Sequence, residues 1–271
     1  MDTKVPELLD LTRKLLDQSV EIVNDSLQSV ESVPMAEILY SNFLHAQISE
    51  ALKFGYGAYH SCNNGWGHGG IGAARSIYEI FLDIKYINDD EARKDERFER
   101  FVDHLAQARY DQMKRNLGIG KEIPEETQHR IKHDYEQLKK KYKDKHEQDL
   151  NSGKAKVDAT PKYNRRNWAG INLSEKVKEV NLEQFHQLYR ELSDLSHVSM
   201  RAVHEARTYW IDLNFHPSYV HCSSVLNVVF PCILGILGEY MKYFRVECPC
   251  YPTLEKILKR RDELENKKRN S

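Results

Sequence analysis

The chain has few of the residues that make turns, and apolar and polar residues seldom alternate along it. Its 271 residues include only 13 glycines and 8 prolines, whereas many short strands joined by tight turns would require more of both. Charged residues make up 30% of the sequence and hydrophobic residues 40%, a balance that is common in soluble helical proteins. We therefore predict an all-α fold.

Cysteines are also scarce, and no apolar leader is apparent. The first residues, MDTKVPELLDLTRKLL, have no apolar run before a small-residue cleavage site, so we expect no secretory signal. The five cysteines are odd in number. Without export, thiols stay reduced. We expect a cytoplasmic protein with reduced cysteines.

The sequence contains no long hydrophobic run. The longest, residues 225–237, is interrupted by Asn227, Pro231 and Gly235, and it is shorter than the roughly 20 residues that span a bilayer. We expect this segment, within a helix at residues 220–244, to be a buried core helix or a subunit interface. We therefore expect no membrane as a partner.

Metal-binding motifs are missing as well. No pair among the histidines and cysteines that could form a cluster has the i, i+3 or i, i+4 spacing of a helical zinc site. The Cys248-Pro249-Cys250 segment has no second pair at finger spacing. We expect neither a metal nor a cofactor. The residues considered for a cluster are His60, Cys62, His68, His216 and His221.

The net charge is only −1, so the whole molecule does not attract nucleic acid or acidic membranes. Residues 129–170 nevertheless hold 12 Lys and Arg against 6 Asp and Glu. This local excess could contact the phosphates of RNA, or it could simply be a solvated face. The candidates for contacts with RNA are Lys139, Lys140, Lys141, Arg165 and Arg166.

Apolar residues at helical spacing predict most of the chain's organisation. We expect an N-terminal helix within residues 1–34, a helical bundle core at 35–247 and a charged helix at 248–271. A projecting charged helical hairpin, broken at 118–124, and a loop are inserted at about 90–165. The glycine-dense segment 63–72 is expected to be a connector. Ser174 and Asn181 are expected to cap the two helices that follow Trp168.

The most informative stretch is residues 185–208, which as one helix has two distinct sides. One side is apolar, and the polar residues of the other side fall within about 40° of a single line. This polar side could be the reactive face of a nuclease or an ordinary solvated face. The polar residues are Arg190, Asp194, His197, Arg201, His204 and Thr208.

A second candidate pair lies on the apolar helix predicted at residues 73–88. Arg75 and Glu79 are four residues apart and share one helical face. The pair could be a partly buried ion pair that specifies the core, or it could line the edge of a pocket.

These residues resemble a known family pattern. Arg75-Ser-Ile-Tyr-Glu79, Trp168 and the segment from Tyr189 to His197 are similar to motifs of domain-of-unknown-function family 5677. The resemblance would span roughly residues 39–243. That family carries no known activity.

Arg190 and His197, with six residues between them, also resemble the arginine–histidine motif of HEPN-type proteins. Glu191 follows the arginine here, where those enzymes have Asn, Asp or His. The resemblance implies a helical bundle, often a homodimer, that cuts RNA without metal at a site built from both subunits. It also implies a role as a toxin or in antiviral defence.

The chemistry of this pair suits RNA, which carries its own nucleophile, the 2′-hydroxyl. Histidine can exchange a proton near neutral pH, and arginine can stabilise the charge on a phosphoryl group. Arg190 and His197 are separated by about 10 Å of helix rise, so a two-fold dimer would have to bring them together. The supporting residues would be Asp194, Arg201, His204, Arg75 and Glu79.

Three functions are compatible with these observations, and the least favoured of them is a membrane-perturbing effector that would use residues 220–244. Two others are favoured over it. The first is a HEPN-like metal-independent endoribonuclease that acts as a homodimer on RNA and is restrained by a regulatory protein partner. The alternative is a non-catalytic helical module for dimerisation or partner binding, which would use residues 220–244 as its interface.

Overall fold

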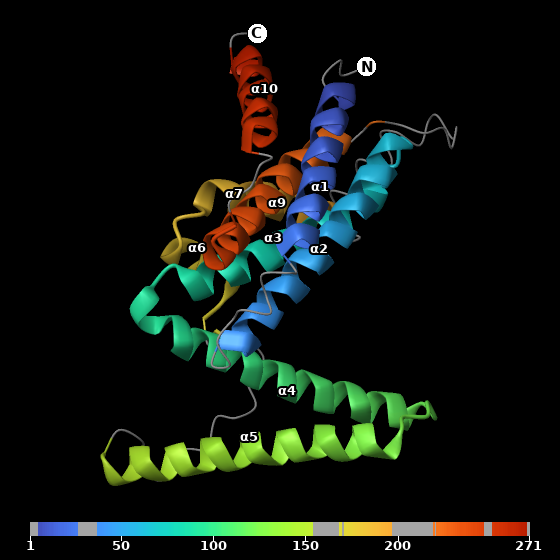
Figure 1. Ribbon diagram of the computed structural model, residues 1–271. Coiled ribbons are helices and arrows are strands. Elements are labelled where there is room, and N and C mark those ends of the chain that lie inside the picture. Colours follow the sequence, from blue (N-terminus) through green and yellow to red (C-terminus); the bar gives the residue numbers. More distant parts are fainter. Residues whose placement is uncertain are drawn as a thin grey trace. The chain divides into compact units, whose positions relative to one another are not determined.

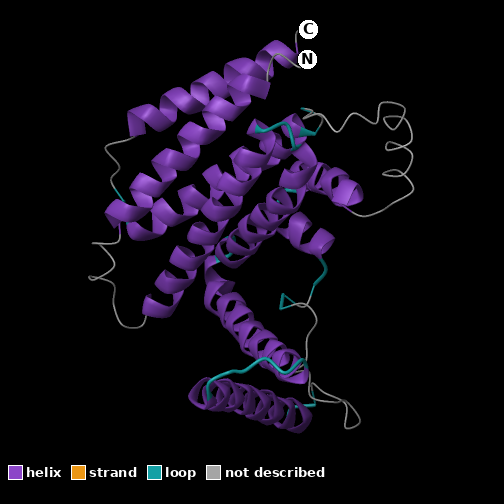
Figure 2. Ribbon diagram, turned by 90° about the vertical axis from the view of Figure 1, so that its right-hand side faces the viewer, coloured by secondary structure: helices purple, strands orange, loops and turns teal. Residues whose placement is uncertain are grey.

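A computed structural model describes residues 5–26, 37–153, 168–169, 171–196, 219, 221–246 and 251–269. The regular elements in these ranges are all helices (Figures 1 and 2). The predicted all-α fold is therefore confirmed. The chain divides into two compact units, of which the first comprises residues 1–86 and 180–271 and the second residues 87–179. The insertion predicted at about 90–165 falls within unit 2.

Unit 1 is built around one apolar helix, α9. Eleven of its 23 residues are buried, and it contacts α1, α2 and α7. This packing uses the apolar surface of α9 inside the unit, in line with the expectation of a buried core helix. The helices that begin in unit 1 are α1 (Val5–Ser26), α2 (Ile38–Asn63), α3 (Gly67–Asn88), α7 (Glu183–Ser196), α9 (Cys222–Phe244) and α10 (Tyr251–Arg269).

Two glycines allow the helices of unit 1 to approach closely. A methyl group on Gly55 of α2 would lie 2.6 Å from Leu16 Cδ2 of α1 and 3.6 Å from Ile233 Cδ1 of α9. On α9, a methyl group on Gly235 would collide with the ring of Phe81, with Cζ only 2.8 Å away. Side chains from neighbouring helices therefore occupy the space that a Cβ atom would need.

Helix α9 is longer than its uninterrupted apolar run, contrary to the expectation that the segment is too short to span a bilayer. Its uninterrupted apolar run is short, but the helix as a whole is long and apolar enough to cross a membrane by length and composition. Its most apolar window is 56% buried inside the structure. Asn227, which interrupts the run, accepts a hydrogen bond from the Arg261 guanidinium of α10.

Unit 2 contains a hairpin of two long helices, α4 (Lys94–Gly118) and α5 (Glu125–Asn151), preceded by a short 3-10 turn, η3 (Glu91–Arg93). The predicted break at 118–124 is confirmed, and Gly120 within it adopts φ +74°. The helices run antiparallel (Figure 1). Tyr110 stacks on Tyr135 with ring centroids 3.8 Å apart. A shorter helix, α6 (Leu173–Glu179), completes the described elements of unit 2.

Three local predictions were wrong. Ser174 does not cap α6, because Asn172 Oδ1 accepts from the Glu175 backbone N–H at 2.9 Å and Glu175 Oε2 accepts from the Asn172 N–H at 2.8 Å. That reciprocal pair is a capping box. Asn181 lies before the cap position of α7, in a turn at φ 55°. The glycine-dense connector is shorter than predicted, because α3 already begins at Gly67.

Candidate functional site

Helix α7 has a buried side and an exposed side. Tyr189 and Leu192 are buried, whereas Arg190 is exposed. Leu192 was predicted on the apolar side and Arg190 on the polar side, and their burial agrees with that prediction. Helix α7 is described as far as Ser196. The buried side holds α7 in unit 1, and the exposed side presents Arg190 to solvent.

Arg75 and Glu79 meet at Tyr189. The Tyr189 hydroxyl donates to Glu79 Oε1 at 2.8 Å, and the Arg75 guanidinium carbon lies 5.6 Å from the centre of the Tyr189 ring. Burial raises the pKa of Tyr189; the hydrogen bond to Glu79 also raises it, and the one to Arg75 opposes the rise. Tyr189 therefore stays a neutral donor that holds α7 against α3.

His186 is a site residue that the sequence analysis missed. It lies one helical turn before Arg190, and its Nδ1 atom is 3.4 Å from the hydroxyl oxygen of Tyr78, a buried residue of α3. Its ring also stacks on Tyr189, with centroids 5.9 Å apart. His186 is four residues before Arg190, so helical spacing alone places both residues on the same side of α7.

The charge of Arg190 acts on His186. Burial lowers the pKa of His186 below its ordinary value, and the positive charge of Arg190 lowers it further. A histidine with a lowered pKa is neutral at pH 7 and can accept a proton. The pair thus combines a proton acceptor with a permanent cation on one exposed edge of α7.

The lysine run predicted to contact RNA lies on α5 of unit 2. Lys139 pairs with Glu136 at 3.1 Å, and Lys141 pairs with Asp103 at 2.7 Å and with Glu99 at 2.9 Å. Lys140 is exposed. Two of the three lysines are therefore neutralised by neighbouring carboxylates.

Several other predicted residues cannot be placed. His197, Arg201, His204, Arg165 and Arg166 lie outside the described residues, and Asp194 belongs to α7 but its side chain is not described.

The histidines and cysteines considered for a metal cluster come together only in part. His68 and His221 have ring centroids 4.6 Å apart. The Cys62 and Cys222 thiols each donate to the other residue's carbonyl oxygen, at 3.9 and 3.6 Å, and burial raises the pKa of both thiols. Within the described ranges no group of three or more His, Cys, Asp or Glu could hold a metal ion. His216 lies outside those ranges.

The chain matches a family model. The model of a family of unknown function (DUF5677) matches residues 42–208, which is more than half of the chain. The match includes Arg75, Glu79 and the segment from Tyr189 to His197. It ends before α9, whereas the resemblance was expected to extend to about residue 243. No curated protein and no solved structure matches the chain.

Proposed function

Because the chain belongs to this family of unknown function, DUF5677, we propose its function from the geometry of α3 and α7. The protein is a HEPN-like, metal-independent endoribonuclease that acts as a homodimer. It cuts RNA by attack of the 2′-hydroxyl on the adjacent phosphorus.

The observation that carries this proposal is the pairing of His186 with Arg190. Four residues apart on one helix, they are separated by about 6 Å of rise, so one phosphodiester can contact both side chains. The charge of Arg190 already lowers the pKa of His186, which indicates that the two groups share one electrostatic environment.

The proposed cleavage uses two histidines for proton transfer and one arginine for charge stabilisation. His186 accepts the proton of the 2′-hydroxyl, the 2′-oxygen forms a bond to phosphorus, and the bond from phosphorus to the 5′-oxygen breaks. Arg190 stabilises the charge on the phosphoryl oxygens in the pentavalent transition state. In this proposal His197, from the same chain or from the second subunit, donates a proton to the departing 5′-oxygen. The products carry a 2′,3′-cyclic phosphate and a 5′-hydroxyl.

In this proposal the substrate does not contact Tyr189, Glu79 or Arg75. These residues hold the part of α7 that carries His186 and Arg190 in position. The hydrogen bond from Tyr189 to Glu79 fixes the rotation of α7 relative to α3. That rotation sets where both His186 and Arg190 point, because they are the residues three before and one after Tyr189.

The test uses the full chain, mixed RNA and an excess of chelator, with 2′,3′-cyclic phosphate ends as the readout. We expect the wild-type protein to generate these ends. Arg190→Ala should lower the rate by about 10²–10³-fold, and His186→Ala by about 10²–10⁴-fold. Gln187→Ala is the matched control, since Gln187 is exposed on the same helix and should leave the rate unchanged.

The outcomes separate the activity from the residues that perform it. A wild-type protein that cuts no RNA would contradict the ribonuclease proposal. Cleavage that is unaffected by both substitutions would leave the activity standing and would show that the site lies elsewhere. Comparison of His197→Ala with His186→Ala then tests which histidine accepts the proton and which donates it.

The pH dependence gives a further prediction. Because the pKa of His186 is lowered, the acid limb of kcat/KM should fall below the ordinary histidine value of about 6.5. Arg190→Gln removes the positive charge that lowers this pKa, so the limb should move to higher pH. The histidine pKa measured by NMR should move in the same direction. An unchanged limb would mean that another group titrates.

A further inference from the structure

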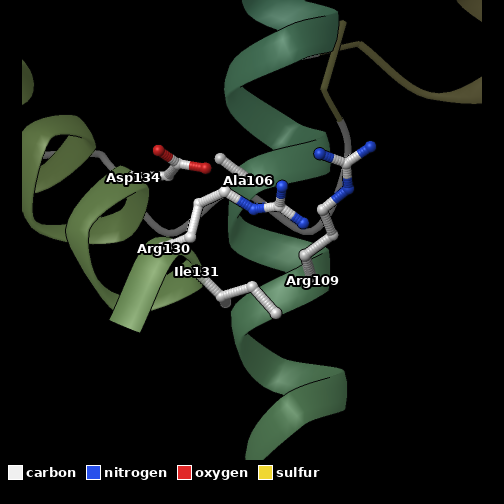
Figure 3. Close-up of a pocket in the computed structure, with 5 residues that line it drawn as sticks. All are labelled: Ala106, Arg109, Arg130, Ile131 and Asp134. Carbon is white, nitrogen blue, oxygen red and sulfur yellow. The ribbon is translucent and has the colours of Figure 1, made fainter. Parts of the chain in front are cut away.

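The hairpin of unit 2 contains a groove that the proposed chemistry does not use. It has a volume of about 610 Å³, and both helices of the hairpin contribute to it. Figure 3 shows Arg130 extending from α5 toward α4, where Arg109 also projects. The lining residues are Ala106, Arg109, Arg130, Ile131 and Asp134.

The two arginines of this groove differ from three basic residues of the same hairpin that have carboxylate partners. Arg100 of the same hairpin pairs with Glu96, and Lys139 and Lys141 pair with carboxylates. Arg109 and Arg130 are both exposed, and within the described part of the chain neither guanidinium forms a hydrogen bond or an ion pair. Their charges are thus available to an external anion.

The surroundings of the groove favour a phosphate ligand. Guanidinium groups bind phosphate oxygens through two parallel N–H donors. Ala106 presents only a methyl group to the groove, which leaves room between the helices. A single carboxylate, Asp134, faces two cations, so the local charge remains positive.

The groove is also preformed. Tyr110, next to Arg109, stacks on Tyr135, next to Asp134, with ring planes only 8° apart. This stack fixes the register of α4 against α5, and the register sets the separation of the two arginines. A preformed site avoids the cost of ordering its residues when the ligand binds.

We propose that Arg109 and Arg130 bind the phosphodiester backbone of an RNA strand, so that the hairpin is a substrate-holding surface of the ribonuclease. The choice of RNA over a free phosphate compound rests on the proposed function. The binding of phosphate groups rests on the groove alone.

The test measures binding of a fluorescein-labelled single-stranded RNA by anisotropy, between about 50 and 200 mM salt. The protein is the full chain with His186→Ala, so that the RNA stays intact. Combined Arg109→Ala and Arg130→Ala should weaken binding. It should also reduce the slope of log affinity against log salt by about 1.4, because each phosphate contact on a single strand contributes about 0.7.

Matched variants show whether the groove itself is responsible. Arg115→Ala removes an exposed arginine of α4 that does not line the groove, and it should have a smaller effect than either groove substitution. Asp134→Asn removes the one carboxylate and should tighten binding severalfold. Arg109→Lys with Arg130→Lys keeps both charges, so the salt slope should stay while part of the affinity is lost.

Each result decides a separate point. If the double alanine variant binds RNA as Arg115→Ala does, the groove proposal is wrong. If inorganic pyrophosphate binds the groove as tightly as RNA does, the assignment to an RNA strand is wrong. If RNA binds through the groove but the wild-type protein cuts no RNA, the groove proposal is supported and the ribonuclease proposal is contradicted. If RNA is cut equally well without the two groove arginines, the ribonuclease proposal is supported and the groove proposal is contradicted.

Discussion

Unit 1 and unit 2 are both helical, but different interactions hold their helices together. In unit 1, the buried residues of α9 are apolar except for Tyr240 and two cysteine thiols. In unit 2, α4 buries only four residues, and two of them, Arg97 and Gln107, are polar. One chain therefore contains a core stabilised by the hydrophobic effect and a hairpin that depends largely on polar contacts.

The contacts of unit 2 show what this difference means. Arg97 is 3% exposed and pairs with Glu179 of α6 at 3.0 Å. Lys176 lies over the ring of Trp168, 4.5 Å from its centre. Such contacts fix the register of helices but add little net stability, because charged groups lose solvation when they are buried. We expect unit 2 to be the less stable unit and the more sensitive to salt.

The largest expected effect comes from the core of unit 1. Leu16→Ala removes a side chain that is 0% exposed, at the place where α1 and α2 meet beside Gly55. It should lower the free energy of unfolding of unit 1 by about 2–5 kcal/mol. Leu138→Ala in α5 should cost about 2 kcal/mol or less, because its two-helix surroundings can collapse or admit water. Hydrogen exchange resolved by segment measures each unit separately.

Leu117→Ala is the control for this pair. Leu117 is 39% exposed, so its removal should change stability by no more than about 0.5 kcal/mol. An equal loss for Leu16→Ala and Leu138→Ala would contradict the distinction between the two units.

The next largest effect is expected where the helices of unit 1 approach each other closely. Gly235→Ala forces a methyl group into the ring of Phe81, which is itself 6% exposed. We expect a loss of about 1–3 kcal/mol from overpacking. Gly238→Ala, on the same helix with nothing within 4 Å, should instead stabilise by about 0.5–1 kcal/mol, because alanine favours helix. Opposite signs in thermal unfolding would confirm that contact with Phe81 is responsible.

The helices could be predicted because their apolar spacing is a local property of the sequence. A helix was predicted within residues 1–34, where α1 lies, and the hairpin was predicted to break at 118–124, between the end of α4 and the start of α5. Caps are less predictable, since Asn172 and Ser174 are both good capping residues and the choice depends on where α6 begins.

The candidate site was predictable only where it depends on one helix. Arg190 is exposed as the helical spacing implied, and His186 was within reach of the same reasoning. That Tyr189 would join Arg75 and Glu79 could not be foreseen, because it depends on how α7 is rotated against α3. The pairing of Arg109 with Arg130 depends in the same way on the register of α4 and α5, more than 20 residues apart in sequence.

The smallest expected effect concerns the ion pair between Asp103 and Lys141 in unit 2, which should depend on salt concentration. Asp103 accepts hydrogen bonds from Lys141 Nζ at 2.7 Å and from the Tyr142 hydroxyl at 3.0 Å. Asp103→Asn removes the charge but keeps an oxygen acceptor. We expect a loss of about 1 kcal/mol in the stability of the hairpin at low salt, measured by hydrogen exchange of α4 and α5.

High salt should separate the ionic part of this loss from the rest. At about 1 M salt the Debye length is about 3 Å, so the difference between wild type and Asp103→Asn should shrink. Glu136→Gln, which breaks the more exposed pair with Lys139, should have little effect at either salt concentration. The cost of Leu16→Ala should not shrink, because apolar burial is not screened. If salt leaves the Asp103→Asn loss unchanged, the hairpin is held by hydrogen bonds and packing rather than by charge, and the contrast between the two units is one of burial alone.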